Sequence, residues 1–393
     1  MKLTADLNMV KKINKSLVLE QIRQRAPISR ALIAERTGLT KATVSSLVQE
    51  LIDSHLVHEI GAGKSRGGRR PMMLHFNSNA GHAIGIDLGV KSFTAVLVDL
   101  NGAVIAEEYS RHRSSSETEV IRDVKEAIRK LCRQAPESPY GIIGIGIGIP
   151  GFSDEEGNVL FAPNLGWNDV PLRQTLEQEF SIPVIIENEA NAGAVGERQF
   201  GSGRGTSSLI YVSLSEGIGT GIWINDELYR GVSGFAGEFG HVSVDPYGKP
   251  CRCGNSGCWE LYASENALLE SARIAFADET IDLHDLLKRA DEGDPTALSL
   301  FDRVGRYLGI GIVNMMNAFN PEKIVLGGRL ALARRWLEGA IFEELEKRSV
   351  PHPRKKLQLM FTGASGRATV LGAAWMAISD FIGAEPKQVK GEI

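Results

Sequence analysis

The hydrophobic pattern at the start of the chain predicts three helices separated by turn residues. The first covers residues 12–24, where apolar residues recur at helical spacing. Pro27 interrupts this pattern, and Ser29 is placed to cap a second, short helix that ends at Gly38. Thr40 then caps a third helix, KATVSSLVQELIDSH, which has its own apolar face. Two helices joined by a short glycine-containing turn are typical of a helix-turn-helix.

A basic β-hairpin is predicted after the third helix. Apolar residues around Leu56, and alternating ones at Met72, Leu74 and Phe76, favour two strands. The turn between them, GAGKSRGGRRP, carries four cations on a glycine-rich backbone. Such a turn can act as a wing that lies against DNA, and it can equally be a flexible linker between domains.

The amino end of the second helix of a helix-turn-helix enters the major groove of DNA. Short hydroxyl and cationic side chains at that end suit base edges and phosphates, and arginines of the wing suit a narrow minor groove. The residues expected to contact DNA are Lys41, Thr43, Ser45, Ser46, Arg66, Arg69 and Arg70.

From residue 82 the pattern changes to apolar strands with glycine-rich turns. Three strands are predicted in AIGIDLGVKSFTAVLVDLNGAVIAEE, with a tight NG turn before the third. The elements predicted after them are a helix at 120–132, the strand GIIGIGIGIPG, helices at 171–180 and 190–199, strands at 183–187 and 208–213, a long helical region at 263–316 and the strand KIVLGGRLA. This β-β-β-α-β-α-β order, which occurs about twice, predicts an actin-like ATPase fold of two lobes with a cleft between them. The expected fold class is α/β, with a winged helix-turn-helix at residues 1–76 and the two-lobed body at 82–385.

Charge separates the same two regions. Residues 1–76 contain thirteen Lys/Arg and six Asp/Glu, whereas the whole chain has a net charge of −4. A basic head on an acidic body is typical of a DNA-binding module joined to another domain. No apolar run approaches the ~20 residues of a membrane helix, and the first residues do not read as a secretory signal. We therefore expect a cytoplasmic protein.

Three of the four cysteines lie in one short segment, CRCGNSGCWE. Their spacing, C-x-C-x₄-C, and the glycines at 254 and 257 allow tight turns that bring three thiolates onto one ion. A disulfide interpretation leaves one cysteine of the cluster over, and a redox CxxC is absent from the sequence. Cys251, Cys253 and Cys258 are therefore predicted to bind Zn²⁺ in a reducing compartment.

Five motifs of the body resemble those of the ROK family, which groups bacterial sugar kinases with repressors built on the same scaffold. They are IGIDLG, GIGIPG, ENEANAGAVGE, GVSGFAGEFGHVSVD and CRCGNSGCWE. Within the family, the last three together are similar to repressors of xylose utilisation. The resemblance covers essentially the whole chain. It implies a sugar-responsive transcriptional repressor that binds palindromic operator DNA as a homodimer, with D-xylose as the expected inducer.

The resemblance also suggests ligands. It makes His241 the fourth zinc ligand, which would close a Cys₃His site and make the zinc structural. It places Glu238 and His241 against the sugar. Glu260, two residues beyond Cys258, would be held by the same loop. Carboxylates and amides suit sugar hydroxyls because each oxygen accepts in a defined direction. The full expected set is Gly151, Asn164, Asn188, Glu189, Glu238, His241 and Glu260.

Two departures from the kinases of the family argue against catalysis. The ROK kinases that this chain resembles have an aspartate in the position of Glu189. They also have a phosphate-binding turn of the type Asp-x-Gly-Gly-Thr. Here that turn reads DLGVK, residues 87–91, so the second glycine and the threonine are missing. We therefore expect no enzyme activity. The second glycine-rich turn, SEGIGTG, is retained, so residual nucleotide binding stays open, as does the choice between repressor and activator.

Overall fold

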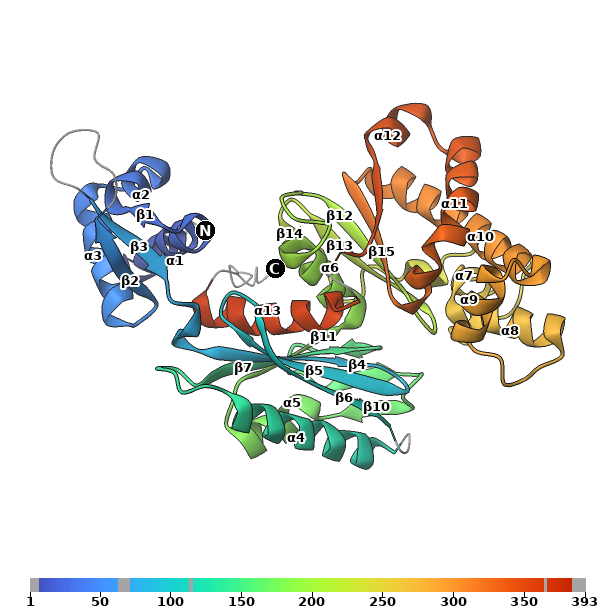
Figure 1. Cartoon of the computed structure of the whole chain (residues 1–393), viewed down its shortest axis with the longest axis horizontal. Coiled ribbons are helices and arrows are strands. Elements are labelled where there is room, and N and C mark those ends of the chain that lie inside the picture. Colours follow the sequence, from blue (N-terminus) through green and yellow to red (C-terminus); the bar gives the residue numbers. More distant parts are fainter. Residues whose placement is uncertain (1–6, 63–70, 113–115, 364–365, 384–393) are drawn as a thin grey trace.

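The head of the chain is a winged helix-turn-helix in the computed structural model, which describes residues 7–62, 71–112, 116–363 and 366–383 (Figure 1). Its elements are α1 (Leu7–Arg25), β1 (Ile28–Ser29), α2 (Arg30–Thr37), α3 (Lys41–Asp53), β2 (Val57–Ala62) and β3 (Met72–Phe76). The strands form an antiparallel sheet in the order β1-β3-β2.

Local capping signals fix the helix boundaries as the sequence predicts. The Ser29 hydroxyl accepts a hydrogen bond from the Leu32 N–H at 3.3 Å, and Gly38 ends α2 with φ = 71°. The Thr40 hydroxyl accepts from the Thr43 N–H at 3.1 Å. The expected apolar face of α1 is only partly buried: Ile13 is 56% exposed, because the core of the head packs against the later turns of the helix.

The first lobe of the body is built on a five-stranded sheet in the order β11-β7-β4-β5-β6. Its elements are β4 (His82–Leu88), β5 (Ser92–Asp99), β6 (Val104–Arg111), α4 (Glu117–Gln134), β7 (Ile142–Ile149), α5 (Leu172–Phe180), β11 (Val184–Asn188) and α6 (Glu189–Phe200). Helices α4 and α5 pack on one face of the sheet. A small sheet of β8 (Phe152–Ser153), β9 (Val159–Ala162) and β10 (Trp167–Val170), which the sequence interpretation missed, follows β7.

The second lobe repeats this topology with the order β14-β13-β12-β15-β16. Its strands are β12 (Leu209–Leu214), β13 (Ile218–Ile224), β14 (Glu227–Leu228), β15 (Lys323–Gly327) and β16 (Gln358–Phe361). Its helices are α7 (Glu260–Ala263), α8 (Glu265–Phe276), α9 (Leu283–Asp291), α10 (Pro295–Phe319), α11 (Arg334–Arg348) and α12 (Pro351–Lys356). In each sheet the first three strands are antiparallel and the last two are added in parallel, which confirms the predicted twofold repeat.

Helix α13 (Ala368–Ile382), which the sequence interpretation did not single out, packs against α6 and crosses the first-lobe sheet toward the head (Figure 1). The Ser16 hydroxyl of α1 donates to the Gly383 carbonyl at 3.2 Å, and the Arg23 guanidinium lies 4.4 Å from the Trp375 ring centroid. Buried residues of the head and of α13 belong to one hydrophobic core. Among the described helices, none combines enough length and apolarity to cross a membrane.

Candidate functional site

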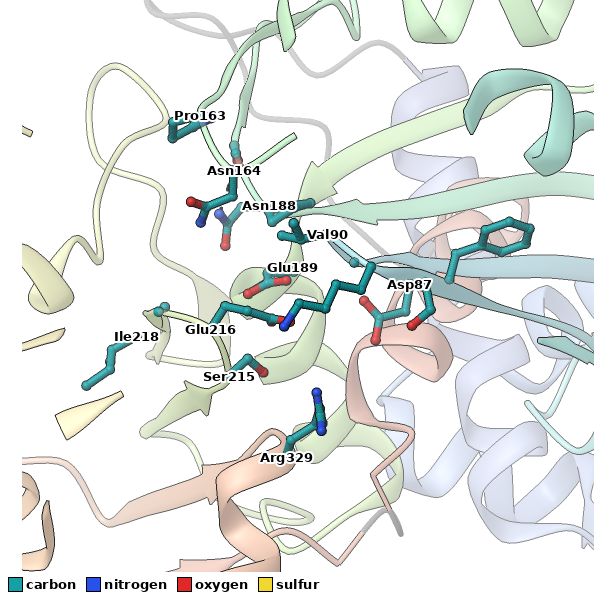
Figure 2. A pocket seen from close by; sticks show the side chains of 18 of the residues that line it. Asp87, Val90, Pro163, Asn164, Asn188, Glu189, Ser215, Glu216, Ile218 and Arg329 are labelled. Atoms are coloured by element: carbon teal, nitrogen blue, oxygen red, sulfur yellow. Dashed lines mark hydrogen bonds and ion pairs between the residues drawn. The ribbon is translucent and has the colours of Figure 1, made fainter. Parts of the chain in front are cut away.

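A cavity of about 550 Å³ lies between the lobes (Figure 2). Its walls come from the β4–β5 turn, the residues after β7, the β11–α6 junction, the β12–β13 turn and the loop before α7. All seven residues expected to bind sugar line it: Gly151, Asn164, Asn188, Glu189, Glu238, His241 and Glu260. In Figure 2, Asn164 and Asn188 lie on one side of Glu189, and Ser215 and Arg329 lie on the other.

The side chain of Asn188 is largely committed to the protein. Its Oδ1 accepts from the N–H groups of Ala190 and Asn191 at 2.9 and 3.3 Å, which caps α6. Its Nδ2 donates to the Gly151 carbonyl at 3.1 Å. Because a primary amide has two N–H donors, one N–H of Asn188 remains for a ligand in the cavity.

Two carboxyl groups of the first lobe that line the cavity, those of Glu189 and Asp87, have raised pKa values. Burial, with the charges of Asp87 and Glu216 as smaller causes, raises the pKa of Glu189 to about 8. Burial, with Glu216 as the smaller cause, raises the pKa of Asp87 to about 7. Glu189 is therefore mainly protonated at neutral pH, so it can donate a hydrogen bond to a sugar hydroxyl as well as accept one.

Several charged residues of the cavity were not expected from the sequence. Arg111, Glu216 and Arg329 line it, and Lys91 Nζ lies 3.7 Å from Glu216 Oε1, which joins the two lobes across the cleft. Glu216 belongs to the retained SEGIGTG turn, and Arg329 directly follows the Gly327–Gly328 pair. The position of Glu216 and Arg329 beside these glycine motifs could therefore have identified them from the sequence as cavity residues.

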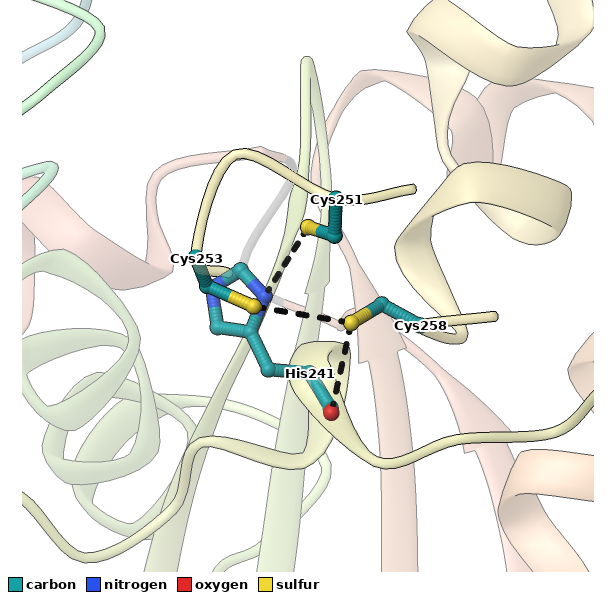
Figure 3. Close-up of side chains that lie close together, drawn as sticks. All are labelled: His241, Cys251, Cys253 and Cys258. Carbon is teal, nitrogen blue, oxygen red and sulfur yellow. Dashed lines mark hydrogen bonds between the residues drawn. The ribbon is translucent and has the colours of Figure 1, made fainter. Parts of the chain in front are cut away.

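The three clustered cysteines and His241 converge beside the cavity (Figure 3). One ligand atom from each of the four residues lies within 4.8 Å of the others. The Sγ atoms of Cys253 and Cys258 are 3.6 Å apart, and Cys251 Sγ is 3.7 Å from His241 Nδ1. Ligands of a tetrahedral zinc at about 2.3 Å lie roughly 3.8 Å from one another, so this donor set fits Zn²⁺.

A cation would favour the ionised form of two of these thiols, whereas a hydrogen bond from the Asn255 backbone already lowers the pKa of Cys253. Burial raises the pKa of Cys258 to about 12 and also raises that of Cys251. A divalent ion would replace the thiol protons and hold the loop through Cys251–Cys258 in one conformation. Cys132 lies in α4, away from this cluster.

His241 connects the cysteine cluster to the cavity. Its Nδ1 faces Cys251, whereas its Nε2 lies 3.8 Å from Glu238 Oε2. Glu260 Oε1 lies 3.5 Å from the same Nδ1. A metal held by Nδ1 would fix the orientation of the ring and leave Nε2 for Glu238 or a ligand. Burial raises the pKa of Glu238.

The head presents polar side chains on the outer face of α3. Lys41, Ser45 and Ser46 are exposed, whereas Thr43 is half-buried and its hydroxyl contacts that of Thr40 at 2.8 Å. Three of these four residues are therefore free to meet a ligand such as DNA. The expected wing residues Arg66, Arg69 and Arg70 lie outside the described residues.

Comparisons with known proteins agree with this architecture. The model of the ROK family matches residues 83–380, and that of a winged helix-turn-helix DNA-binding domain matches residues 13–58. The chain is 43% identical to the xylose repressor of Bacillus spizizenii, over 96% of this chain and 98% of that one.

The chain is also similar to solved structures of ROK proteins. A ROK family transcriptional regulator, described as a homologue of the Escherichia coli MLC protein, aligns with a TM-score of 0.82 at 29% identity, over 95% of this chain and 98% of that one. A ROK glucokinase from Streptomyces griseus, in complex with glucose and AMPPNP, aligns with a TM-score of 0.68 at 30% identity. This alignment covers 75% of this chain and 98% of the glucokinase. The chain therefore belongs to the ROK family, and it carries a winged helix-turn-helix head before the ROK domain.

Proposed function

We propose that this protein is a sugar-responsive transcriptional repressor, in which the head binds a palindromic operator as part of a homodimer and D-xylose in the cleft is the inducer. The observation that carries the proposal is the combination of an exposed recognition helix and a polar cavity in one chain, joined by α13. The repressor with 43% identity supports the same conclusion. We further propose a cytoplasmic location and a structural Zn²⁺ held by His241 and the three cysteines.

Helix α13 offers a physical route from the sugar site to the head. At its first turn, the Thr369 hydroxyl donates to the main-chain carbonyl of Glu189 at 3.1 Å. At 1.5 Å per residue, Trp375 lies about 9 Å further along and Gly383 about 21 Å, and both contact α1. A shift of the β11–α6 junction when sugar binds would therefore reach the head through one rigid element.

The energy required is modest. A ~100-fold loss of operator affinity on sugar binding needs ~2.7 kcal/mol of coupling, which is within the usual allosteric range. By linkage, operator DNA must weaken sugar binding by the same factor. If sugar and operator bind independently in a titration, the inducer model is wrong.

The length of the Glu189 side chain favours xylose over a hexose as the inducer. In the orientation we propose, the exocyclic hydroxymethyl group of an aldohexose points toward this carboxyl, and xylopyranose lacks that group. Glutamate is one methylene longer than the aspartate of the related kinases, so it would fill the vacant space. Glu189→Asp should raise glucose affinity relative to xylose; an unchanged preference in calorimetry would contradict this role.

The cavity favours sensing over phosphoryl transfer. The Lys91–Glu216 pair lies between the two turns that would hold nucleotide phosphates, and the first turn lacks its glycine and threonine. A displacement of ~1 Å in a catalytic carboxyl costs ~100-fold in rate, which is the scale of change from aspartate to Glu189. We expect no sugar-dependent ATP turnover with xylose or glucose.

The test of the proposed function is an operator mobility shift with a panel of pentoses and hexoses, with and without a zinc chelator. We expect xylose to release DNA at the lowest concentration, and chelation to weaken the sugar response rather than operator binding. Operator binding that no sugar in the panel alters would refute the proposal. Reporter expression in a strain lacking the gene separates repressor from activator.

A further inference from the structure

The loop of residues 229–240, here called the Glu238 loop, joins the two lobes on one side of the cavity. It follows β14 of the second lobe and carries Glu238, one of the expected sugar ligands. Its attachment to the second lobe is tight: the Thr220 hydroxyl donates to the Gly237 carbonyl, and the Tyr229 N–H donates to the Ile222 carbonyl at 2.8 Å. The Glu238 loop is therefore fixed to β13 at both ends.

The same loop reaches the first lobe at two points. Arg230 Nε donates to Glu187 Oε2 at 2.9 Å, and the ring of Phe235 packs edge-on against Phe152 with centroids 4.8 Å apart. Glu187 is the more buried partner, with 14% of its side chain exposed against 35% for Arg230. An ion pair that is partly shielded from water is stronger than an exposed one.

Glu187 also holds the opposite wall of the sugar site. Its Oε1 accepts from the Asn188 N–H at 2.9 Å and from Asn191 Nδ2 at 3.0 Å. These contacts fix the β11–α6 junction, where Asn188 and Glu189 face the cavity. One carboxylate therefore orients two walls of the cavity, the junction through Oε1 and the Glu238 loop through Oε2.

We propose that Arg230 and Glu187 are positioning residues for the sugar, and that their ion pair holds the Glu238 loop at the distance from the β11–α6 junction that a bound sugar requires. This inference rests on the proposed sugar-binding function. Neither residue lines the cavity itself, so the pair acts through Glu238, Asn188 and Glu189. Without the pair, sugar binding must order the loop, and that entropy reduces affinity.

The variants are Arg230→Ala, Glu187→Gln and the double variant in the full-length protein. Glu187→Gln keeps an oxygen for Asn188 and Asn191 but turns an NH₂ toward Arg230, so it breaks the pair and preserves the junction. The matched control is Asp226→Asn, because Arg198 Nη2 joins α6 to Asp226 Oδ1 at 3.0 Å without either residue lining the cavity.

Two measurements test the positioning role of the ion pair independently of whether the protein binds sugar. In calorimetry with D-xylose, each single variant should bind about tenfold more weakly, and the double variant no more weakly than either single one. Asp226→Asn should match the wild type. Hydrogen exchange of the sugar-free protein should rise in residues 229–240 of both single variants and stay unchanged in the remainder of the second lobe. Arg230→Lys should restore part of the affinity.

Losses that multiply in the double variant, or wild-type exchange in residues 229–240, would overturn the positioning role while leaving sugar binding intact. A wild-type protein that binds no sugar of the panel, but whose variants show raised exchange, would instead overturn the proposed function and with it the positioning role. Equal melting temperatures of the single variants and the control exclude general unfolding as the cause of a loss.

Discussion

The half-buried carboxyl of Glu189 should make the protein less stable as the pH rises from acid to neutral. In the unfolded chain this glutamate ionises near pH 4.5, whereas burial in the cavity raises its pKa to about 8. Between these two values the folded state binds more protons than the unfolded state, so stability falls with increasing pH. Glu189→Gln removes the titrating group and should flatten that fall.

The magnitude follows from the linkage relation. One fully shifted group changes the free energy of unfolding by at most about 1.4 kcal/mol per pH unit, or about 2.7 kcal/mol between pH 5.5 and 7.5. Glu189 faces a cavity that water can enter, so we expect about 1–2 kcal/mol over this interval. Asp87, whose pKa is raised to about 7, contributes a similar dependence that remains in the variant.

The assay is urea unfolding of the wild type and of Glu189→Gln at pH 5.5, 6.5 and 7.5, with linear extrapolation to water. The stability of the variant relative to the wild type should increase with pH. The control is Glu137→Gln, at an exposed position, which should show a constant difference. A Glu189→Gln difference that is constant with pH, or that decreases, would refute the assigned burial.

Three further predictions concern the metal, the DNA contact and the link between the sites. Cys258→Ser should bind less than one zinc per chain in metal analysis and bind xylose at least tenfold more weakly, whereas Cys132→Ser should do neither; full sugar affinity without metal would contradict the supporting role of the loop. Lys41→Ala should weaken operator binding at all sequences and reduce the slope of log affinity against log salt by about one, and a change confined to one base position would argue for base readout instead. Trp375→Leu removes the stacking of Arg23 on the Trp375 ring. In a mobility shift it should reduce the sugar-induced loss of operator affinity from ~100-fold to less than tenfold, while sugar alone and operator alone still bind. Undiminished release of the operator by sugar would exclude α13 as the route between the two sites.

Local signals accounted for much of the head and for the order of strands. Ser29, Gly38 and Thr40 act within a few residues of themselves, so their capping roles could be predicted from the sequence. The cysteine spacing and its glycines likewise predicted the convergence that Figure 3 shows. Such signals depend on the backbone conformation of a few neighbouring residues. A short segment of the sequence is therefore enough to predict them.

Contacts between distant segments could not be predicted in this way. Helix α13 is buried nearly all round, so its sequence, ATVLGAAWMAISDFI, has no polar face to mark it as amphipathic. Its close packing on α6 depends on Gly372, where a Cβ would lie 1.8 Å from the Ala192 carbonyl oxygen. The Arg230–Glu187 pair joins residues 43 positions apart, and neither residue type alone indicates its partner.

The continuity of the core between the head and α13 bears on how such proteins can be recombined. Val18 and Ile22 of α1 belong to the same hydrophobic core as Trp375 and Ile378 of α13. A head cut from this chain would expose part of its own interior, and a foreign head would have to match the surface of α13. Chimaeras that exchange operator specificity should therefore retain α1 and replace only the outer face of α3.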